Sequence, residues 1–251
     1  MLLREGLTVW GTAREVARLE SFSSEKNFSA VVLDLADGPK VEEVFQRASE
    51  AAGSFDLVIN NAGFGVFAPF DCQSADDVAK QVSTALLGPL HLAHAAVRVM
   101  KARNRGCLVN VSSVAVEFPL PFMMSYNVTK AGLSALSESL MFEMRGSHVT
   151  VLDFRPGDYR TNFNRAMHVN PTQLETTAEP RLARVWRTLE SNLAAAPAPE
   201  KAASDLRRAL SKGRSGTVYS GGFFQTRLAP LWARLAPLSL RRAIAARYFG
   251  A

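Results

Sequence analysis

The feature that most constrains the fold is a regular alternation of short apolar segments with longer segments of helical periodicity. The strand-like segments are Leu7–Trp10, Ala30–Leu33, Phe55–Ile59, Cys107–Val111, Val149–Phe154 and Thr217–Tyr219. The helix-like segments are Val41–Ala52, Val78–Lys101, Tyr126–Met144 and Pro199–Leu210. Such alternation is typical of a parallel sheet covered by helices. The sequence therefore predicts an α/β fold with a doubly wound parallel sheet and an irregular insertion at residues 158–196.

Polar and turn-forming residues follow several of the predicted strands. They are Asp34, Asn60 and Ser113 after three different strands, and Pro156, Gly157 and Thr161 after a fourth. In an open parallel sheet, ligands bind outside the carboxyl ends of the strands. We therefore expect these residues to converge in one crevice.

Composition excludes several classes of protein. Hydrophobic residues make up 47% of the 251 residues, which suits a globular protein with a core of normal size. The chain has no run of about eighteen apolar residues, which argues against a membrane-spanning helix, and residues 1–6 are too few and too polar for a signal peptide. Because the only cysteines are Cys72 and Cys107, a reducing cytoplasm is expected rather than a disulfide framework.

The net charge of +6 is unevenly placed along the chain. No acidic residue follows Asp205, whereas nine basic residues do, which leaves 20 basic and 23 acidic residues in the remainder. The body of the protein is therefore mildly acidic, and its C-terminal part is strongly basic. This distribution does not indicate a body that binds nucleic acid.

Tyr126 and Lys130 lie four residues apart in a predicted helix, so both side chains point the same way. A free tyrosine titrates near pH ~10, and a neighbouring ammonium group stabilises the phenolate and lowers that pKa. Such a pair can exchange a proton with a substrate oxygen. Ser113, at the end of a predicted buried strand, is placed to hydrogen-bond the same oxygen. The alternatives are an exposed pair on an amphipathic helix and a serine that caps the next turn.

Four motifs occur in the order and at the spacing of a known family. They are Asn60-Asn61-Ala62-Gly63, Val109-Asn110-Val111-Ser112-Ser113, Tyr126-Asn127-Val128-Thr129-Lys130 and Arg155-Pro156-Gly157. Over nearly the whole chain the sequence resembles the short-chain dehydrogenase/reductase family. The resemblance implies a Rossmann-type fold and hydride transfer between a nicotinamide cofactor and a carbonyl or secondary alcohol. It also implies that Ser113, Tyr126 and Lys130 are catalytic, with Lys130 binding the nicotinamide ribose as well.

The same resemblance implies a cofactor site. The matching residues are Asn60, Ala62 and Gly63 on the adenosine side, Asp34 and Leu35 near the adenine, and Pro156, Gly157 and Thr161 at the nicotinamide amide. Arg14 stands where NADP-preferring members carry a base for the 2′-phosphate, and the planar guanidinium suits phosphate. We therefore expect NADP rather than NAD. The alternative for Arg14 is a solvated residue at the start of a helix.

The chain departs from the family in two places. The family begins with a strand, a Gly-rich turn and a helix that bind the pyrophosphate, whereas residues 1–6 resemble only the end of that helix. The missing strand would lie between those at Leu7 and Phe55, and its loss would leave two open edges and a hole in the core. Either the natural chain starts further upstream, as we expect, or this is a degenerate member. Second, Ala85 replaces an asparagine of the family's proton relay.

The last segment, residues 226–251, is expected to form a tail that follows the Rossmann-type domain at residues 1–225. Its apolar residues at helical spacing are Leu228, Leu231, Trp232, Leu235, Leu240, Ile244, Tyr248 and Phe249, with arginines beside them and a break at Pro237. A basic amphipathic segment is typical of helices that lie on anionic membranes. The pattern fits a lid or a dimer contact as well.

The sequence thus predicts an NADP(H)-dependent oxidoreductase that forms a homo-oligomer in the cytoplasm or at a membrane surface. An apolar small-molecule substrate is expected from Phe118, Leu120 and Phe122 after the serine, and from Phe163 and Met167 in the insertion. No metal site is expected, because His91 and His94 lack a third ligand. The rival hypothesis is a non-catalytic protein of the same fold that acts in binding or as a scaffold. The missing loop and Ala85 favour that rival, and the intact catalytic residues oppose it.

Overall fold

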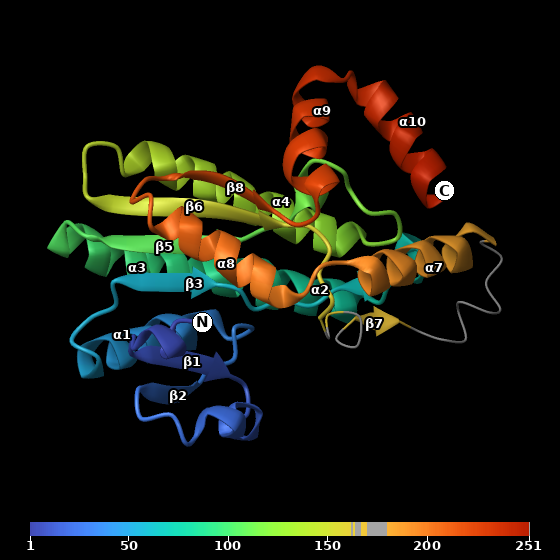
Figure 1. Cartoon of the computed structure of the whole chain (residues 1–251). Coiled ribbons are helices and arrows are strands. Elements are labelled where there is room, and N and C mark those ends of the chain that lie inside the picture. The colour runs from blue at the N-terminus through green and yellow to red at the C-terminus, as the bar shows by residue number, and fades with distance from the viewer. Residues whose placement is uncertain (162, 164–166, 170–179, 251) are drawn as a thin grey trace.

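The computed structural model describes residues 1–161, 163, 167–169 and 180–250 (Figure 1). Its larger sheet has four parallel strands in the order β3 (Leu57–Asn60), β5 (Gly106–Val111), β6 (Val149–Pro156) and β8 (Gly216–Ser220). A separate parallel pair consists of β1 (Val9–Ala13) and β2 (Phe28–Val32). A third, short pair joins β4 (Val66–Phe67) to β7 (His168–Val169). The predicted α/β class with parallel strands is confirmed.

Helices cover both faces of the larger sheet. The helices of the described residues are α1 (Gly38–Ala51), α2 (Ala75–Val82), α3 (Gly88–Arg103), α4 (Met124–Glu143), α7 (Pro180–Ala195), α8 (Pro199–Leu210), α9 (Ala229–Leu235) and α10 (Leu238–Phe249), of which α1, α3 and α4 pack on one face and α8 on the other. Leu108 of β5 packs in a buried cluster with α1, α3 and α4, whereas its neighbour Val109 packs with α8. Successive residues of a strand point to opposite faces, so the two clusters form separate helical layers.

Several predicted boundaries are wrong, for identifiable reasons. The strand predicted at Leu7–Trp10 is displaced to Val9–Ala13, because Gly11, Thr12 and Ala13 pair residue for residue with β2. A Cβ at Gly11 would lie 2.6 Å from the Phe28 ring, so a larger residue there would require that ring to move. A tertiary contact thus places in a strand a glycine that reads locally as a turn residue.

Two helical regions also differ from the sequence prediction. The long helix predicted at Val78–Lys101 is α2 followed by a π-helical turn at Ser83–Leu87 and then α3. The insertion predicted as irregular lies partly outside the described residues, and its described part contains β7 and α7. In α7 the residues Leu182, Val185 and Leu189 are buried. Their spacing is that of an amphipathic helix, which the sequence analysis overlooked.

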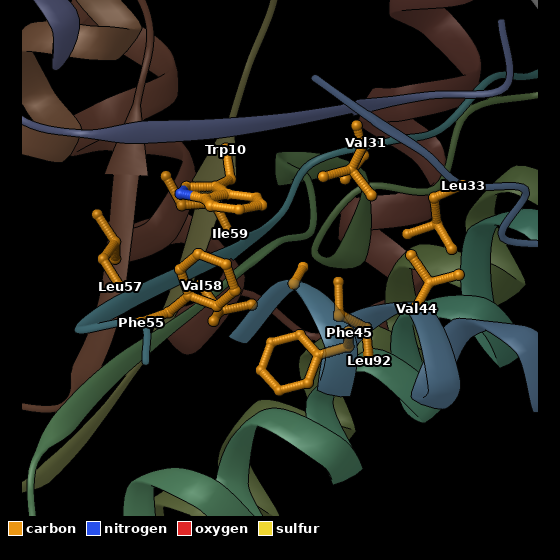
Figure 2. A pocket seen from close by; sticks show the side chains of 12 residues that line it. Trp10, Val31, Leu33, Val44, Phe45, Phe55, Leu57, Val58, Ile59 and Leu92 are labelled. Carbon is orange, nitrogen blue, oxygen red and sulfur yellow. The ribbon is translucent and has the colours of Figure 1, made fainter. Parts of the chain in front are cut away.

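An apolar cavity separates β1 from β3 (Figure 2). Within the described part of the chain β1 hydrogen-bonds only to β2, and β3 only to β5. The cavity holds about 600 Å³ of empty space, counting the part open to solvent. Its lining residues are Trp10, Thr12, Val31, Leu33, Val44, Phe45, Ala48, Phe55, Leu57, Val58, Ile59 and Leu92. We call this space the strand gap. The doubly wound sheet is therefore divided into two parts, rather than continuous.

The C-terminal helices project from the body. Figure 1 shows α9 and α10 as a helical hairpin above the larger sheet, with α10 returning toward α7. Phe249 at the end of α10 is buried in a cluster with Leu182 and Val185 of α7, and the Tyr248 hydroxyl donates a 2.9 Å hydrogen bond to Asn192. No helix formed by the described residues is both long and apolar enough to cross a bilayer.

Candidate active site

The carboxyl ends of β3 and β5 are tied together by two asparagines. Asn60 and Asn110 are register partners, and the Asn60 Nδ2 group donates to Asn110 Oδ1 at 2.8 Å and to the Pro89 carbonyl at 3.0 Å. Both asparagines are buried. These bonds fix the turn that starts at Asn60, so that Asn61, Ala62 and Gly63 emerge at the exposed edge of the sheet.

Tyr126 and Lys130 lie in the first half of α4 and face the ends of β5 and β6. Their side chains are buried, with exposed fractions of 8% and 6%. Lys130 Nζ lies 5.8 Å from the centre of the Tyr126 ring and donates a 2.7 Å hydrogen bond to the Val111 carbonyl. An exposed helical pair, the alternative considered from sequence, does not describe this geometry.

Burial dominates the electrostatics of this pair. It lowers the pKa of Lys130 to about 8, although the negative charge of Asp153 acts in the opposite direction. Burial also raises the pKa of Tyr126, and Asp158 adds to that rise while a hydrogen bond with Ser113 opposes it. From the sequence, Lys130 is expected to lower the pKa of Tyr126. In this structure the net direction is upward, because removing the phenolate from water outweighs the favourable contacts.

Ser113 ends the β5 segment and sits beside the tyrosine. Its hydroxyl oxygen accepts a 3.0 Å hydrogen bond from the Ala115 amide, so it caps the short helix Val114–Val116 as well. Ser112 is turned the other way, and its hydroxyl donates to the buried carboxylate of Asp153. The two serines therefore differ in position: only Ser113 is directed to Tyr126.

Gly63 brings the turn after β3 next to the catalytic helix. A Cβ added at Gly63 would lie 3.6 Å from Lys130 Nζ. Lys130 Nζ has three donors and uses one of them on Val111. Within the described part of the chain, two donors of this ammonium group therefore remain for a ligand beside the Gly63 turn.

The turn after β6 forms the opposite wall of the site. The Gly157 amide donates a 2.7 Å hydrogen bond to the Ser220 carbonyl of β8. Thr161 is exposed, and its hydroxyl accepts a bond from the Phe163 amide. Pro156 and Gly157 therefore lie at the end of β6, as expected. Among the described residues, the Thr161 side chain hydrogen-bonds to Phe163 and not to Ser113, Tyr126 or Lys130.

Asp158, which the sequence analysis missed, is close enough to influence Tyr126. Burial raises the pKa of Asp158, and Gln225 Nε2 donates a 2.8 Å hydrogen bond to its carboxylate. The Asp158 amide donates in turn to Gln225 Oε1 at 3.2 Å. The signal available in the sequence was an acidic residue directly after the Pro156-Gly157 turn.

A second overlooked group is a buried ionic network behind the serines. Asp153 of β6 accepts bonds from Ser112, from Ser134 at 2.8 Å and from Arg155 Nε at 2.7 Å. Arg155 also pairs with Glu117. A carboxylate and a guanidinium two residues apart in an otherwise apolar strand were the available signal. The network holds β5, α4 and β6 together at the site.

The residues expected at the adenine end lie apart from the tyrosine group. Arg14, just after β1, is exposed and forms no ion pair within the described part of the chain. Asp34 is also exposed and uses its carboxylate to accept a 3.0 Å bond from the Ala36 amide. Leu35 lies against Gly88 at the start of α3. These three residues follow the strands β1 and β2, whose Trp10, Thr12 and Val31 line the strand gap.

The position of the family's relay asparagine is a buried alanine. Ala85 lies within the π-helical turn between α2 and α3 and is fully buried. Single π-helical turns within α-helices often occur at functional sites. The methyl group of Ala85 neither donates nor accepts a proton, so any relay must use another group.

Apolar side chains cover the tyrosine on its outer side. Phe163 packs edge-on against Tyr126, with ring centres 5.7 Å apart. The cluster around Tyr126 also includes Phe67, Leu120, Phe122, Met123, Met167 and Trp186. Phe118, which was expected to contribute, is not part of this cluster. The described residues therefore surround the hydroxyl-bearing ring mainly with carbon.

His91 and His94 share one carboxylate. Their Nδ1 atoms lie 3.0 Å and 3.4 Å from Glu42 Oε1. No group of three or more His, Cys, Asp or Glu side chains suited to a metal occurs among the residues that the structure describes. The two histidines join α3 to α1 through this contact.

Comparison with known proteins adds the family. The family model for short chain dehydrogenases matches residues 1–171. The chain belongs to this family. Two members of the family resemble the chain in sequence. The 3-ketodihydrosphingosine reductase of Bacteroides thetaiotaomicron is 27% identical to it over 163 residues. NADPH-dependent 1-acyldihydroxyacetone phosphate reductase of Schizosaccharomyces pombe is 31% identical over 159 residues.

These matches cover 65% and 63% of the chain. The chain spans little more than half the length of these relatives, with coverage of 59% and 53% of their sequences. Among solved structures, a short-chain dehydrogenase from Streptomyces avermitilis superposes with a TM-score of 0.78 at 26% identity. That superposition covers 98% of this chain and 88% of the other. The fold is therefore that of the short-chain dehydrogenases, a family of oxidoreductases.

Proposed function

We propose that the protein is an NADP(H)-dependent oxidoreductase that interconverts a carbonyl and a secondary alcohol on an apolar small molecule. The observation that carries the proposal is the convergence of Ser113, Tyr126 and Lys130 beside Gly63. These three buried polar side chains lie together at the carboxyl ends of parallel strands, and each can form hydrogen bonds. Such a position is the usual ligand site of this architecture.

In the direction of reduction, Tyr126 donates its proton to the alkoxide that develops on the substrate. The hydroxyl is protonated at neutral pH, as a donor must be, but its raised pKa makes it a weak acid, so the donation depends on groups that stabilise the phenolate. Ser113 hydrogen-bonds the same substrate oxygen and holds it near the tyrosine. Lys130, charged below its pKa of about 8, stabilises negative charge on the tyrosine oxygen after the proton has left.

The residues present fit the nicotinamide end of the cofactor. Lys130 has donors left for the ribose hydroxyls among its described contacts, Gly63 lies beside it without a side chain, and Pro156 and Gly157 follow at the end of the neighbouring strand β6. When bound, the nicotinamide supplies or accepts the hydride. The chain's own residues orient the carbonyl and move the proton.

The pyrophosphate end needs a part that the described residues do not provide. A phosphate-binding turn requires backbone amides at a helix N-terminus after a strand, and the place for that strand is the strand gap between β1 and β3. We propose that a parallel strand followed by a Gly-rich turn fills the gap in the active protein. The apolar lining of the gap supports this, since a strand inserted in a sheet between helical layers is apolar on both faces.

NADP is the proposed cofactor rather than NAD. Arg14 follows β1 at the adenine end, is exposed and has no acidic partner among the described residues. A free guanidinium there favours a phosphate group. The relative from S. pombe is named as NADPH-dependent, which supports the same choice.

An apolar substrate is proposed from the cluster around Tyr126. Phe163 covers the tyrosine ring, and Leu120, Phe122 and Met167 pack nearby. Two relatives are named as a 3-ketodihydrosphingosine reductase and a 1-acyldihydroxyacetone phosphate reductase, which supports a lipid-like ketone. A ketone with an alkyl chain is therefore the first substrate class to test.

We also propose that the protein forms a homo-oligomer.

The test of the gap proposal is the natural N-terminus. The in-frame sequence upstream of Met1, and the mass of the N-terminal peptide of the protein from its own cells, should reveal a strand and a Thr-Gly-x-x-x-Gly-x-Gly-like turn. A stop codon directly upstream would exclude a preceding segment as the source of the strand.

The test of the proposed activity uses the form that includes such a turn. It should oxidise NADPH in the presence of long-chain ketones, as followed by absorbance. The alternative function is a binding or scaffold protein without turnover, which Ala85 and the divided sheet favour. Loss of NADPH oxidation with every ketone, despite measurable NADPH binding, would support that alternative.

A further inference from the structure

The C-terminal hairpin exposes an unusual amount of apolar surface. Its exposed large apolar side chains are Phe223, Phe224, Leu228, Leu231, Trp232, Leu235, Leu238, Leu240, Ile244 and Tyr248. Leu235 is 75% exposed. Contiguous exposed apolar patches of this kind on a protein surface mark contact sites rather than ordinary solvent-facing surface. We call residues 223–250 the hairpin segment.

The exposed apolar residues form one stripe on α9. Leu228, Leu231, Trp232 and Leu235 are spaced three, four and seven residues apart, so they share a face of the helix. On α10, Leu240, Ile244 and Tyr248 are spaced by four. The opposite side of α10 holds Phe249, which is buried against α7. The hairpin therefore has an inner side, where Phe249 and the Tyr248 hydroxyl attach it to α7, and an outer side whose apolar residues are exposed.

The positive charge of the hairpin segment indicates which kind of surface it would bind. Arg227, Arg234, Arg241, Arg242 and Arg247 lie in it, and it has no acidic residue. None of these five arginines forms an ion pair within the described ranges, although other basic residues of the chain do, such as Arg207 with Glu5. Four of the five are exposed, whereas Arg241 is half-buried with its Nε atom enclosed, so the four exposed arginines carry the argument. An apolar stripe flanked by unpaired cations complements a surface that presents alkyl chains below a layer of negative charge.

We infer that the hairpin segment docks the protein on anionic membranes, with the apolar stripe at the level of the acyl chains and the arginines at the headgroups. This inference stands on charge and exposure and does not require the proposed catalysis. The hairpin segment nevertheless lies close to the proposed catalytic site, because Phe249 belongs to the same buried cluster as Tyr126. Docking would hold the covered side of the active site near a membrane that can store an apolar substrate.

The experiment is vesicle binding by the whole chain. Sedimentation with phosphatidylcholine vesicles containing phosphatidylglycerol should bring down the protein, pure phosphatidylcholine should bring down much less, and high salt should release it. Trp232 is exposed in the stripe, so brominated lipids should quench its emission. Trp232→Phe should remove that quenching without abolishing sedimentation.

Two pairs of variants separate stripe and charge from general effects. Leu235→Glu should lower the partition coefficient at least about tenfold, whereas Val16→Glu, 56% exposed on the β1–β2 lobe, should leave it unchanged. Arg234→Glu with Arg242→Glu should lower it about 30-fold or more. Arg18→Glu with Lys26→Glu changes the net charge equally on the β1–β2 lobe, and should have a much smaller effect. Figure 1 shows that this lobe lies far from α9 and α10.

The alternative occupant of the stripe is a second copy of the chain. Light scattering after size exclusion, without lipid, measures the oligomeric state of the parent and of Leu235→Glu. A dimer that Leu235→Glu converts to monomer, together with absence of vesicle binding by the parent, would overturn the membrane inference. Absence of vesicle binding by a monomeric parent would overturn it as well. Binding to anionic vesicles that is weakened by the hairpin variants, but not by the controls on the β1–β2 lobe, supports the membrane inference. This holds whatever result the NADPH oxidation assay gives.

Discussion

Gly88 at the start of α3 lies so close to Leu35 that a Cβ on the glycine would be 2.2 Å from the Leu35 carbonyl oxygen. The loop after β2, which carries Asp34 and Leu35, is therefore pressed against the beginning of α3. This contact crosses from the β1–β2 pair to the body of the protein. It positions the proposed adenine end of the cofactor site relative to the proposed nicotinamide end.

Gly88→Ala should destabilise the protein by about 1–3 kcal/mol, because backbone must move to admit the methyl group. Urea denaturation of the variant and parent gives this difference. Gly222→Ala is the matched control, since a Cβ there meets nothing within 4 Å, and it should change stability by less than about 0.5 kcal/mol. Equal midpoints for Gly88→Ala and the parent would show that the loop after β2 yields without cost.

Tyr126→Phe should lower turnover about 10²- to 10⁴-fold in the form of the protein that binds NADPH, because only the proton donor is removed. The ring stays in its cluster with Phe163, so the melting temperature should change little. Lys130→Ala should cost at least as much activity, because it removes both the charge near the tyrosine and the donors toward the ribose. Undiminished ketone reduction by Tyr126→Phe would exclude the proposed proton transfer.

Arg14→Asp should reverse the cofactor preference. The parent should bind NADPH more tightly than NADH, and the variant should bind NADH more tightly, as measured by nucleotide fluorescence titration. The physical reason is that a carboxylate repels the 2′-phosphate which the guanidinium attracts. Arg18→Asp, on an exposed neighbouring segment, serves as the control. A parent with the same affinity for both cofactors would remove Arg14 from the proposed site.

Lys130 should give a characteristic dependence of stability on pH. Its pKa is about 8 in the folded protein and 10.5 for a free lysine. Between these values the unfolded chain holds a proton that the folded protein has released, so the contribution of Lys130 to stability rises with pH. Below pH 8 the buried charge costs about 3 kcal/mol.

The measurement compares the parent with Lys130→Met at two pH values. The variant should gain stability relative to the parent at pH 7, and that gain should shrink by about 2 kcal/mol at pH 9.5. Lys101→Met, at an exposed position, should show no such change. A gain that does not depend on pH would mean that Lys130 keeps a normal pKa in the folded protein.

Much of the fold was predictable because its signals are local. Apolar runs such as Val149–Phe154 read as strands, and β6 (Val149–Pro156) contains that run. The helix predicted at Tyr126–Met144 is α4 within two residues at each end. The convergence of Asn60, Ser113 and Gly157 followed from a rule about parallel sheets, and the structure places all three at strand ends.

What could not be predicted depends on contacts between distant segments. Gly11 reads as a turn residue until the Phe28 ring is placed over it. The direction of the Tyr126 pKa depends on how deeply the ring is buried and on Asp158, thirty-two residues further on. The network of Asp153 and Arg155 could not be predicted from the sequence, because their partners Ser134 and Glu117 come from other elements.

The strand gap has a consequence for how the molecule unfolds. Because no backbone hydrogen bonds join β1 to β3 in the described part of the chain, the β1–β2 lobe is held to the body mainly by α1 against α3 and by the Leu35–Gly88 contact. Such a lobe can open as a separate cooperative unit at a lower free energy than the body. Amide protons of Thr12 and Val31 should then exchange with deuterium well before those of Val109 and Leu152. A strand bound in the gap should bring the exchange rates of the β1–β2 lobe and of the body together, so that both unfold as a single cooperative unit.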